Sequence, residues 1–511
     1  MATIKTGAVL GVQAYEVDVE AHLSGGVQIF HVVGLPDGAV RESRVRIPSA
    51  MEHAGWDFPL ERITINLAPA DTRKTGAALD VPIALALIMA TQPGRRTTLD
   101  LQKHLVVGEL GLDGKVRGVA GALPLAVLAR DAGYEGIIVP QANAQEAAVV
   151  EGVRVYAISH LRELTDLLFG DEAPAPCPCA AFEADAGAFA VDFCEVAGQA
   201  AVKRALEVAA AGGHNVLMLG PPGSGKSMLA RRLPTILPAM SFDEALETTA
   251  VYSVAGLLGA QGGLLTERPF RSPHHTISDV GLAGGGSGVP RPGELSLAHH
   301  GVLFLDELPE FKKRTLEVMR QPLEDGHVTI SRSLITLTYP AHIMLVAAMN
   351  PCPCGYFGAS EAPGTRRCIC TQDQVRRYRA RVSGPLLDRI DLHIDVPAVP
   401  YAALRQAGSA EPSATIRARV QAARARQRAR FGDDGVHANA QMRHAHLRAH
   451  CALDEAGHSL LRRAVDRLGM SARASDRILK VARTIADLDG ADTITPLHLA
   501  EAIQYRTLDR G

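Results

Sequence analysis

The sequence predicts an α/β protein whose centre is a parallel sheet, with a smaller α/β region before it and a helical region after it. Three observations predict this class. A glycine-rich segment lies between an apolar run and a helix-like stretch, two later apolar runs end in polar side chains, and the chain becomes rich in Ala and Arg after Pro400. Apolar runs with polar ends are typical of central parallel strands, which are buried on both faces and bind ligands at their carboxyl ends.

The glycine-rich segment is the most informative motif. It follows the apolar residues 215–219 and consists of Gly220, Pro221, Pro222, Gly223, Ser224, Gly225, Lys226 and Ser227. Glycines allow a tight turn whose N–H groups point at one anion, and the following helix adds its dipole. This pattern predicts an ATP phosphate loop in which Lys226 reaches the β- and γ-phosphates and Ser227 holds Mg²⁺.

The second motif is the apolar run 301–305, which ends in Asp306 and Glu307. Downstream of a phosphate loop, we interpret Asp306 as part of the Mg²⁺ shell and Glu307 as the base that polarises the attacking water. A third apolar run, residues 342–349, ends at Asn350. Its amide is expected to orient that water, the alternative being an amide that only caps the strand.

Three arginines are candidates for contacts with the phosphates. Arg389 lies on a turn and would complete the nucleotide site of a neighbouring subunit as an arginine finger. Arg473 and Arg477 open a later helical segment that would bring another guanidinium over the phosphates. The alternative for all three is solvated surface.

The order of these motifs resembles that of the AAA+ ATPases. The residues within the motifs resemble those of the magnesium-chelatase-like ATPases of the bacterial ComM/YifB group. The resemblance extends from the first residues to the last, and it is carried by residues 268–278 with His274 and His275, residues 293–307 with His299 and His300, residues 386–391 and residues 494–506. It implies a homo-oligomeric ring, expected to be a hexamer, that hydrolyses ATP. It also implies DNA as the partner and branch migration during natural transformation, a helicase activity, as the task.

Four cysteines form two close pairs, Cys352 with Cys354 and Cys368 with Cys370. Two such pairs facing each other can present four thiolates to Zn²⁺, although one intervening residue within a pair is tighter than usual. The alternative is free thiols. The ComM-like group resembles this chain in carrying such an insert, whereas typical chelatase motor subunits lack it. Basic residues surround the insert and are either a DNA contact or a solvated face: Arg366, Arg367, Arg376, Arg377, Arg379 and Arg381.

The front region reads as α/β, with strands expected over residues 8–20, 26–33 and 137–140 and helices over 81–90 and 123–130. Parts of it resemble the Lon-protease catalytic domain, with its ribosomal-S5-domain-2-like fold. Alignment places Ala78 at the family's serine and Leu123 at its lysine, so the catalytic pair is absent. Lys74 with Thr75 is a nearby pair for which the sequence offers no matching geometry.

We therefore expect four parts: a non-catalytic Lon-like domain at 1–170, a Pro/Ala-rich linker at 171–193, an AAA+ core at 194–400 with the Cys-rich insert at 351–371, and a C-terminal helical lid at 401–511. Within the last part, the arginines of residues 416–430 are either solvated or phosphate-facing. Cys177 and Cys179 are interpreted as linker residues.

The amino-acid composition excludes few classes of function. A net charge of −2 gives no overall nucleic-acid signature, although the chain from residue 401 carries 18 Lys and Arg against 12 Asp and Glu. The longest apolar stretch, residues 81–90, is too short to span a bilayer, and no signal peptide is recognised, so a cytoplasmic protein is expected.

Three alternatives to a DNA motor remain open. The Lon-like front region and the Cys-rich insert argue against a magnesium-chelatase motor subunit. The missing Ser and Lys argue against an ATP-dependent protease. Glu307 beside Asp306 argues against a binding scaffold that is only switched by nucleotide.

Overall fold

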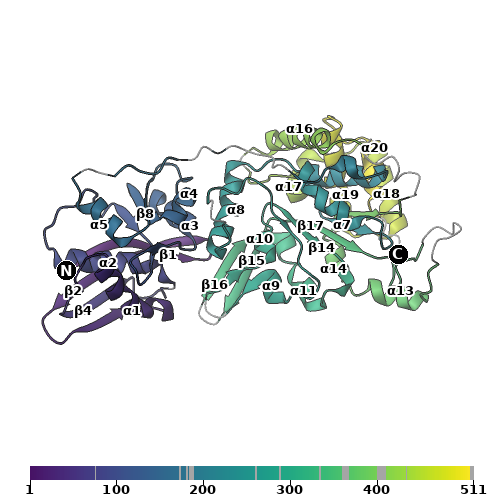
Figure 1. Ribbon diagram of the computed structural model, residues 1–511. Helices are drawn as coiled ribbons and strands as arrows, with labels where there is room; N and C mark the ends of the chain where they lie inside the picture. The colour runs from purple at the N-terminus through teal and green to yellow at the C-terminus, as the bar shows by residue number, and fades with distance from the viewer. Residues whose placement is uncertain are drawn as a thin grey trace.

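The computed structural model describes the chain except residues 75, 172–173, 180–181, 183–188, 259–261, 287–288, 333–334, 359–366, 400–409, 433 and 507–511. It has two bodies side by side: a front body formed by the N-terminal third, and a motor body that carries the C-terminal helices (Figure 1). The predicted class, α/β with a parallel central sheet and C-terminal helices, is confirmed. Thr75, Arg366 and the expected boundary at 400 lie outside the described residues.

The front body contains a four-stranded sheet of order β1-β2-β4-β3 and a parallel sheet of order β5-β8-β9. Its elements are β1 (Ala2–Leu10), β2 (Gln13–Ser24), β3 (Ile29–Val33), α1 (Gly38–His53), β4 (Arg62–Ala68), α2 (Asp80–Thr91), β5 (His104–Val106), β6 (Glu109–Leu110), β7 (Val116–Arg117), α3 (Ala122–Asp131), β8 (Gly136–Pro140), α4 (Ala144–Ala147), β9 (Arg154–Ile158) and α5 (Leu161–Phe169).

One expected strand in this body is wrong. Residues 8–20 do not form a single strand, because the chain reverses at Gly11 and pairs β1 with β2 in antiparallel register, Leu10 opposite Gln13. Gly11 has φ +67°, a conformation that glycine adopts without strain and that a tight turn requires.

The motor body is built on a five-stranded parallel sheet of order β11-β14-β17-β10-β18. Its elements are α6 (Ala200–Gly212), β10 (Val216–Leu219), α7 (Lys226–Arg232), α8 (Phe242–Ala255), β11 (Phe270–Arg271), α9 (Asp279–Ala283), β12 (Gly284–Gly285), β13 (Arg291–Pro292), α10 (Glu294–Leu297), β14 (Val302–Leu305), α11 (Lys313–Val318), α12 (Pro322–Asp325), β15 (His327–Arg332), β16 (Ile335–Pro340), β17 (Met344–Met349), α13 (Gln372–Arg379), α14 (Gly384–Leu387) and β18 (Leu392–Asp395).

Side chains of the central strands alternate between two cores, as the period of a strand requires. On β14, Val302 and Phe304 join the core shared with the C-terminal helices. Leu303 and Leu305 join the core on the other face, with the hairpin β15–β16 and α11. Burial of both faces explains why these runs are apolar throughout.

The C-terminal helices pack on α6 and on the sheet core that α6 covers. They are α16 (Ser413–Phe431), α17 (His444–His450), α18 (Glu455–Leu468), α19 (Ala472–Leu488) and α20 (Pro496–Gln504).

The arginines of α16 are mostly neither solvated nor phosphate-facing. Arg417 donates to the Thr235 carbonyl, and Arg430 pairs with the buried Asp487 carboxylate. Arg419, Arg424 and Arg426 also bond to protein groups, whereas Arg428 is exposed. These side chains therefore anchor the helix to the motor.

A buried polar joint connects the two bodies. The Glu146 carboxylate of α4 is 3% exposed and accepts hydrogen bonds from the Leu123 N–H at 2.9 Å and from the Ser253 hydroxyl of α8. The Gly121 N–H donates to the Ser253 carbonyl at 3.1 Å. A carboxylate buried with its partners in place fixes the two bodies against each other. No described helix combines the length and apolarity needed to cross a membrane.

Candidate nucleotide-binding site

The phosphate loop connects β10 to α7 at the carboxyl edge of the sheet. Gly223 and Gly225 have φ of +76° and +90°, so these two positions use glycine's conformational freedom. Lys226 is 8% exposed, and its Nζ donates to the carbonyls of Gly220 at 2.7 Å and Pro221 at 2.9 Å. Burial lowers the pKa of Lys226, against the opposing charge of Asp306. A bound phosphate would favour the charged ammonium form.

The predicted Mg²⁺ residues lie together. The Ser227 hydroxyl donates to Asp306 Oδ2 at 2.6 Å, although the two residues are 79 positions apart. Asp306 follows β14, whose neighbour β17 lies between it and β10. A hydroxyl and a carboxylate oxygen in contact are a donor set that suits Mg²⁺ beside a triphosphate.

Glu307 has an unusual backbone, with φ +52°. Its N–H donates to Asp306 Oδ1 at 2.9 Å, and its carboxylate lies 3.3 Å from His275 Nδ1. A left-handed conformation is strained for a residue other than glycine, and such strain concentrates at functional sites. The strained turn and the His275 contact hold a half-exposed carboxylate directly after Asp306, at the carboxyl edge of the sheet.

Asn350, at the end of β17, also lies at this edge. Its Oδ1 accepts from Lys226 Nζ at 3.3 Å. The structure therefore brings together Lys226, Ser227, Asp306, Glu307 and Asn350, which sequence reasoning had placed at three separate strand ends.

Arg389 lies at the opposite, amino edge of the same sheet. It precedes β18, and its backbone carbonyl accepts from the side chain of Asn215 at 3.0 Å, immediately before β10. Arg389 is 9% exposed, and its guanidinium donates to the Pro385 carbonyl at 2.7 Å and pairs with the Glu324 carboxylate. One strand length separates the two edges, about 16 Å for the step from Asn215 to Gly220. Arg389 therefore does not join the phosphate loop of its own chain.

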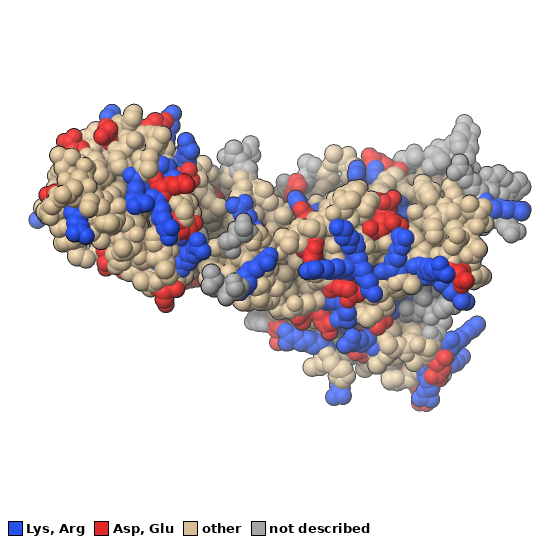
Figure 2. Space-filling model, turned by 90° about the horizontal axis from the view of Figure 1, so that it is seen from below, with Lys and Arg blue, Asp and Glu red and all other residues tan. Residues whose placement is uncertain are grey.

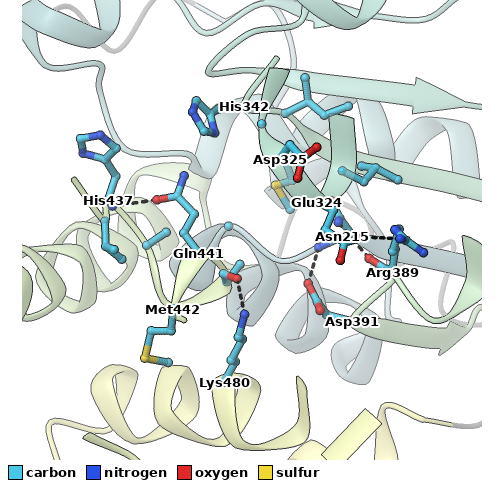
Figure 3. A pocket seen from close by; sticks show the side chains of 18 of the residues that line it. Asn215, Glu324, Asp325, His342, Arg389, Asp391, His437, Gln441, Met442 and Lys480 are labelled. Atoms are coloured by element: carbon cyan, nitrogen blue, oxygen red, sulfur yellow. Dashed lines mark hydrogen bonds and ion pairs between the residues drawn. The ribbon is translucent and has the colours of Figure 1, made fainter. Parts of the chain in front are cut away.

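Arg473 and Arg477 also lie at the amino edge. They line a cavity of about 480 Å³ with Arg389, Asn215 and Asp391. Figure 3 shows Asn215, Arg389 and Asp391 converging there, with Lys480 below them. The expectation that Arg473 lies over the phosphates is thus not met within one chain, because the C-terminal helices cover the amino edge.

Part of the positive charge in this cavity is neutralised by a carboxylate of the same chain. Arg477 pairs with Asp391, and this guanidinium holds the pKa of the buried Asp391 carboxyl well below its usual range despite the cost of burial. Arg473 is exposed. The cavity therefore presents guanidinium groups from two parts of the chain to whatever lies against it.

A histidine cluster borders the same cavity. Burial lowers the pKa of His299 and of His342 to about 4. His299 and His300 both bond to the Glu247 carboxylate, at 3.1 and 2.8 Å. Three such groups could suit a metal, but His299 Nδ1 accepts the backbone N–H of His342, so the proton of the neutral ring sits on Nε2 and faces Glu247. That nitrogen is a donor, so we interpret the cluster as structural.

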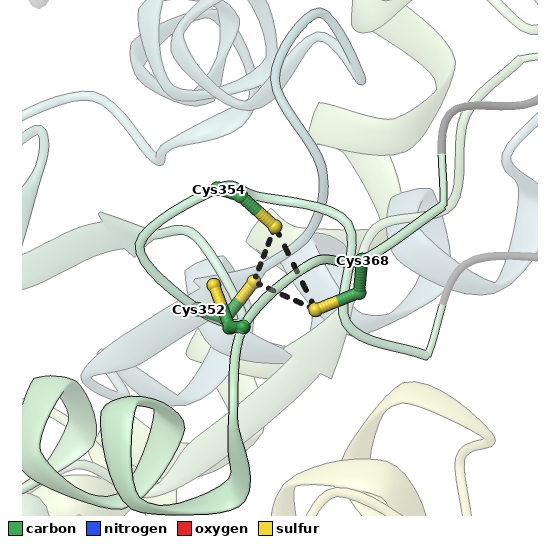
Figure 4. A group of neighbouring side chains, drawn as sticks. Cys352, Cys354 and Cys368 are labelled. Carbon is green, nitrogen blue, oxygen red and sulfur yellow. Dashed lines mark hydrogen bonds between the residues drawn. The ribbon is translucent and has the colours of Figure 1, made fainter.

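The Cys-rich insert leaves the end of β17 and reaches α13. The sulfur of Cys352 lies 3.3 Å from that of Cys354 and 3.7 Å from that of Cys368, and the latter two are 3.6 Å apart (Figure 4). Cys370 completes the group of four. A tetrahedral Zn²⁺ with bonds of about 2.3 Å needs sulfurs about 3.8 Å apart. The donor set therefore fits zinc.

The basic residues around the insert differ in their contacts. Arg379 donates to the Pro351 carbonyl at 3.1 Å, and Arg381 bonds to both Glu310 oxygens at 3.0 Å. Arg367, Arg376 and Arg377 are exposed. Among the described arginines around the insert, these three are exposed and available to an external partner.

The front body offers no protease chemistry at the aligned positions. Ala78 lies in a short 3₁₀ turn before α2, and Leu123 is buried in α3. The nearby Lys74 is fully buried, burial lowers its pKa, and its Nζ contacts no polar partner among the described residues. Thr75 lies outside those residues. Cys177 is partly buried against the front body and donates its N–H to the Val155 carbonyl.

Sequence reasoning missed two residues at the nucleotide site. His275 was noted only as part of a family signature, and its contact with Glu307 depends on the packing of two distant segments. Gln199 donates from its side chain to the carbonyls of Ser224 at 2.9 Å and Pro397 at 3.1 Å, which fastens the phosphate loop to the end of β18. A lone Gln before a helix carries no recognisable signal.

Three family descriptions match this chain. Residues 192–404 match the family described as magnesium chelatase, subunit ChlI, residues 19–143 match subunit ChlI of Mg-chelatase, and residues 410–506 match the ChlI C-terminal family. Together the three matches cover most of the chain and leave residues 144–191 and 405–409 between them.

Two curated relatives match over nearly their whole length, and a third matches over about a quarter of its length. The chain is 44% identical to the uncharacterized protein YifB of Salmonella typhimurium, over 100% of the chain and 98% of the relative. It is 42% identical to the competence protein ComM of Haemophilus influenzae, with the same coverage. It is also 31% identical to Lon protease 2 of Bacillus subtilis, over 27% of the chain and 26% of that protein.

Proposed function

The chain belongs to the magnesium-chelatase-like ComM/YifB family, and from that membership we propose that it is an ATP-hydrolysing ring motor that acts on DNA. The observation that carries the ATPase proposal is the contact of Ser227 with Asp306 beside Glu307. The name of the Haemophilus influenzae relative refers to competence. Branch migration that promotes recombination during natural transformation is accordingly the task we propose.

Each residue at the carboxyl edge has a proposed role. Lys226 binds the β- and γ-phosphates in place of the two carbonyls that it contacts here. Ser227 and Asp306 hold Mg²⁺, which neutralises charge on the phosphates. Glu307 accepts a proton from the attacking water, His275 orients that carboxylate, and Asn350 positions the water on the far side.

The arginines at the amino edge support a ring. Arg389 and Arg473 lie on the wrong edge for their own phosphate loop, and a head-to-tail neighbour would place its loop against them. Arg389 must then exchange Glu324 for the neighbour's γ-phosphate. In a closed ring, proposed as a hexamer, the phosphate loop of every subunit would lie against the arginines of a neighbouring subunit.

A DNA-contacting face is proposed on the lower side of the motor body. Lys and Arg gather on this face, over α11, α13 and the hairpin β15–β16 (Figures 1 and 2). The exposed basic residues of these elements and of the residue before α11 are Lys312, Lys313, Arg314, Arg332, Arg376 and Arg377. Several cations on one face favour a phosphate backbone, independently of base sequence.

The four thiolates are proposed to bind one Zn²⁺ that stabilises the insert next to this face. We retain the proposed division into a Lon-like part at 1–170, a linker at 171–193, an AAA+ core at 194–400 with the insert at 351–371, and a helical part at 401–511. The Lon-like part is proposed to be a scaffold without protease activity, since Ala78 and Leu123 cannot act as nucleophile and base.

The test measures ATPase activity of the full-length chain with single-stranded, duplex and four-way-junction DNA, beside a tetrapyrrole-chelatase assay. We expect stimulation that is greatest with the junction. Replacing Arg376 and Arg377 with Ala should reduce the salt dependence of DNA binding, by about 0.7–0.9 in slope for each lost contact. Replacing the exposed Arg44 and Arg62 of the front body is the matched control.

The main competing function is a chelatase motor subunit, which the family descriptions favour by name. ATP hydrolysis that ignores all three DNAs and supports metal insertion into a tetrapyrrole would establish that function instead. Hydrolysis without either response would leave the ATPase and remove DNA as the substrate.

A further inference from the structure

The Cys-rich insert and the residue before it touch the phosphate loop at two points. Asn350, which directly precedes the insert, accepts from Lys226 Nζ at 3.3 Å. Five residues later, the buried backbone of Gly355 lies against the ring of Pro222. The loop that is proposed to bind the nucleotide and the loop that can bind a metal are therefore in direct contact.

The contact of Gly355 with Pro222 leaves no space for a side chain at Gly355. A Cβ added at Gly355 would lie 2.5 Å from Pro222 Cδ and 2.7 Å from Pro222 Cγ. Real Cβ atoms do not approach other atoms that closely, so only glycine permits this backbone to lie against the Pro222 ring. The ring of Pro222 is rigid and immediately precedes Gly223, so its position sets where the phosphate-binding turn begins.

The cysteines hold Gly355 in place. It follows Cys354 directly, and its N–H donates to the Cys352 carbonyl at 3.0 Å. The described parts of the insert contain no helix or strand between β17 and α13. Since its described parts form no helix or strand, a metal that tied four sulfurs together would be the main constraint on this segment.

We propose that a metal in the Cys352, Cys354, Cys368 and Cys370 site positions the phosphate loop through the Gly355–Pro222 contact, so that metal binding and nucleotide binding strengthen each other. The proposal rests on the proposed nucleotide site and adds a positioning role for Gly355. A loop already held in its binding conformation loses less conformational freedom when the ligand arrives. Because coupling between two sites is reciprocal, the nucleotide must tighten the metal by the same factor.

The insert supplies its own matched control. Gly358 also has positive φ, +74° against +87° for Gly355, but a Cβ added there meets nothing within 4 Å. Alanine is therefore strained at both positions and collides with the phosphate loop only at Gly355. Both variants keep all four thiols.

The first experiment compares Gly355→Ala and Gly358→Ala as full-length proteins loaded with Zn²⁺. Metal content is measured by elemental analysis, and the Kd of a fluorescent ADP analogue by titration. We expect one zinc per chain in both variants and in the wild type. The Kd should rise at least fivefold in Gly355→Ala and stay close to the wild-type value in Gly358→Ala, since couplings between sites are typically about 5–150-fold. Equal Kd values in the two variants would overturn the proposal.

A second experiment does not depend on either variant. Zinc affinity of the wild-type chain is measured by competition with a chelator, with and without ADP, and ADP affinity with and without zinc. We expect the two ratios to be equal and greater than one. Removing the ring by Pro222→Ala in the Gly355→Ala background should restore part of the lost affinity, as in a double-mutant cycle.

The outcomes separate this proposal from the proposed ATPase. ADP affinity that is the same with and without zinc, or a chain that binds ADP and no zinc, overturns the coupling and leaves the nucleotide site intact. A zinc-loaded chain that binds no nucleotide overturns both.

Discussion

The two edges of the central sheet carry complementary groups. At the carboxyl edge, Ser227 contacts Asp306 beside the strained Glu307, and the charge of Asp306 acts on Lys226. At the amino edge, Arg389 and Arg477 are held by carboxylates around a cavity. One edge carries the groups proposed to bind a triphosphate and activate water, and the other carries the cations proposed to stabilise charge on it. A chain with these groups about one strand length apart cannot unite them alone, and a second copy can.

The largest effect is expected at the amino edge. Arg389→Ala should leave ATP binding largely unchanged and reduce turnover about 10³–10⁵-fold, because an arginine finger acts on the transferring phosphoryl group. Steady-state ATPase and nucleotide titration measure the two quantities. Arg320→Ala is the control, since Arg320 also pairs with a carboxylate, Glu317, and does not line the cavity.

Mixing decides whether Arg389 acts on a neighbour. Arg389→Ala protein combined with Lys226→Ala protein, which should be inactive alone, can form junctions with both an intact arginine and an intact phosphate loop. Some activity should return. Mixed rings that are shown to assemble and remain inactive would rule out an intersubunit role.

At the carboxyl edge, Glu307→Gln should preserve ATP binding and slow hydrolysis about 10²–10⁴-fold, the usual contribution of a general base. Single-turnover hydrolysis and binding are measured together. Glu310→Gln, three residues away and paired with Arg381, should hydrolyse normally. Near wild-type hydrolysis by Glu307→Gln would show that the base is another group.

A smaller effect at the same edge follows from Cys368→Ser. Loss of one of four thiolates should release the metal, expose the insert to proteases and weaken binding of junction DNA. Basal turnover at saturating ATP should persist, while KM for ATP rises because the phosphate loop loses its support. Cys194→Ser, outside the insert, is the control. A metal-free wild-type protein with full activity would refute the site.

Acid should affect the amino edge through stability. Burial lowers the pKa of His299 and His342 to about 4 in the folded chain, whereas an unfolded histidine titrates near 6.5. Between these values the unfolded chain binds more protons, so stability falls as pH decreases below about 6.5, by up to about 1.4 kcal/mol per pH unit for each histidine. Denaturant unfolding at pH 7 and pH 5 measures the decrease, and His342→Gln should reduce its slope. An unchanged slope would contradict the assignment.

The local sequence pattern predicted the strands that carry the candidate nucleotide site. It predicted few of the contacts between segments that are distant in the sequence. The runs at 301–305 and 342–349 are apolar because both of their faces are buried, so their strand character is visible in the sequence. The hairpin in residues 8–20 was missed, because alternation continues through the turn at Gly11. The contact of His275 with Glu307 and the partners of the α16 arginines were not predictable, because each depends on segments brought together by the fold. The place of Arg473 at the amino edge was not predictable for the same reason.

The buried joint between the bodies limits how this chain can be recombined with its relatives. The connecting segment around 171–193 is an obvious place for a crossover between two parent sequences. However, Glu146 of the front body accepts a hydrogen bond from the Ser253 hydroxyl of the motor body. A graft that brings an apolar residue to position 253 would leave a buried carboxylate short of one donor, at a cost of about 1–3 kcal/mol. Chimeras should therefore inherit positions 146 and 253 from the same parent, wherever the crossover is placed.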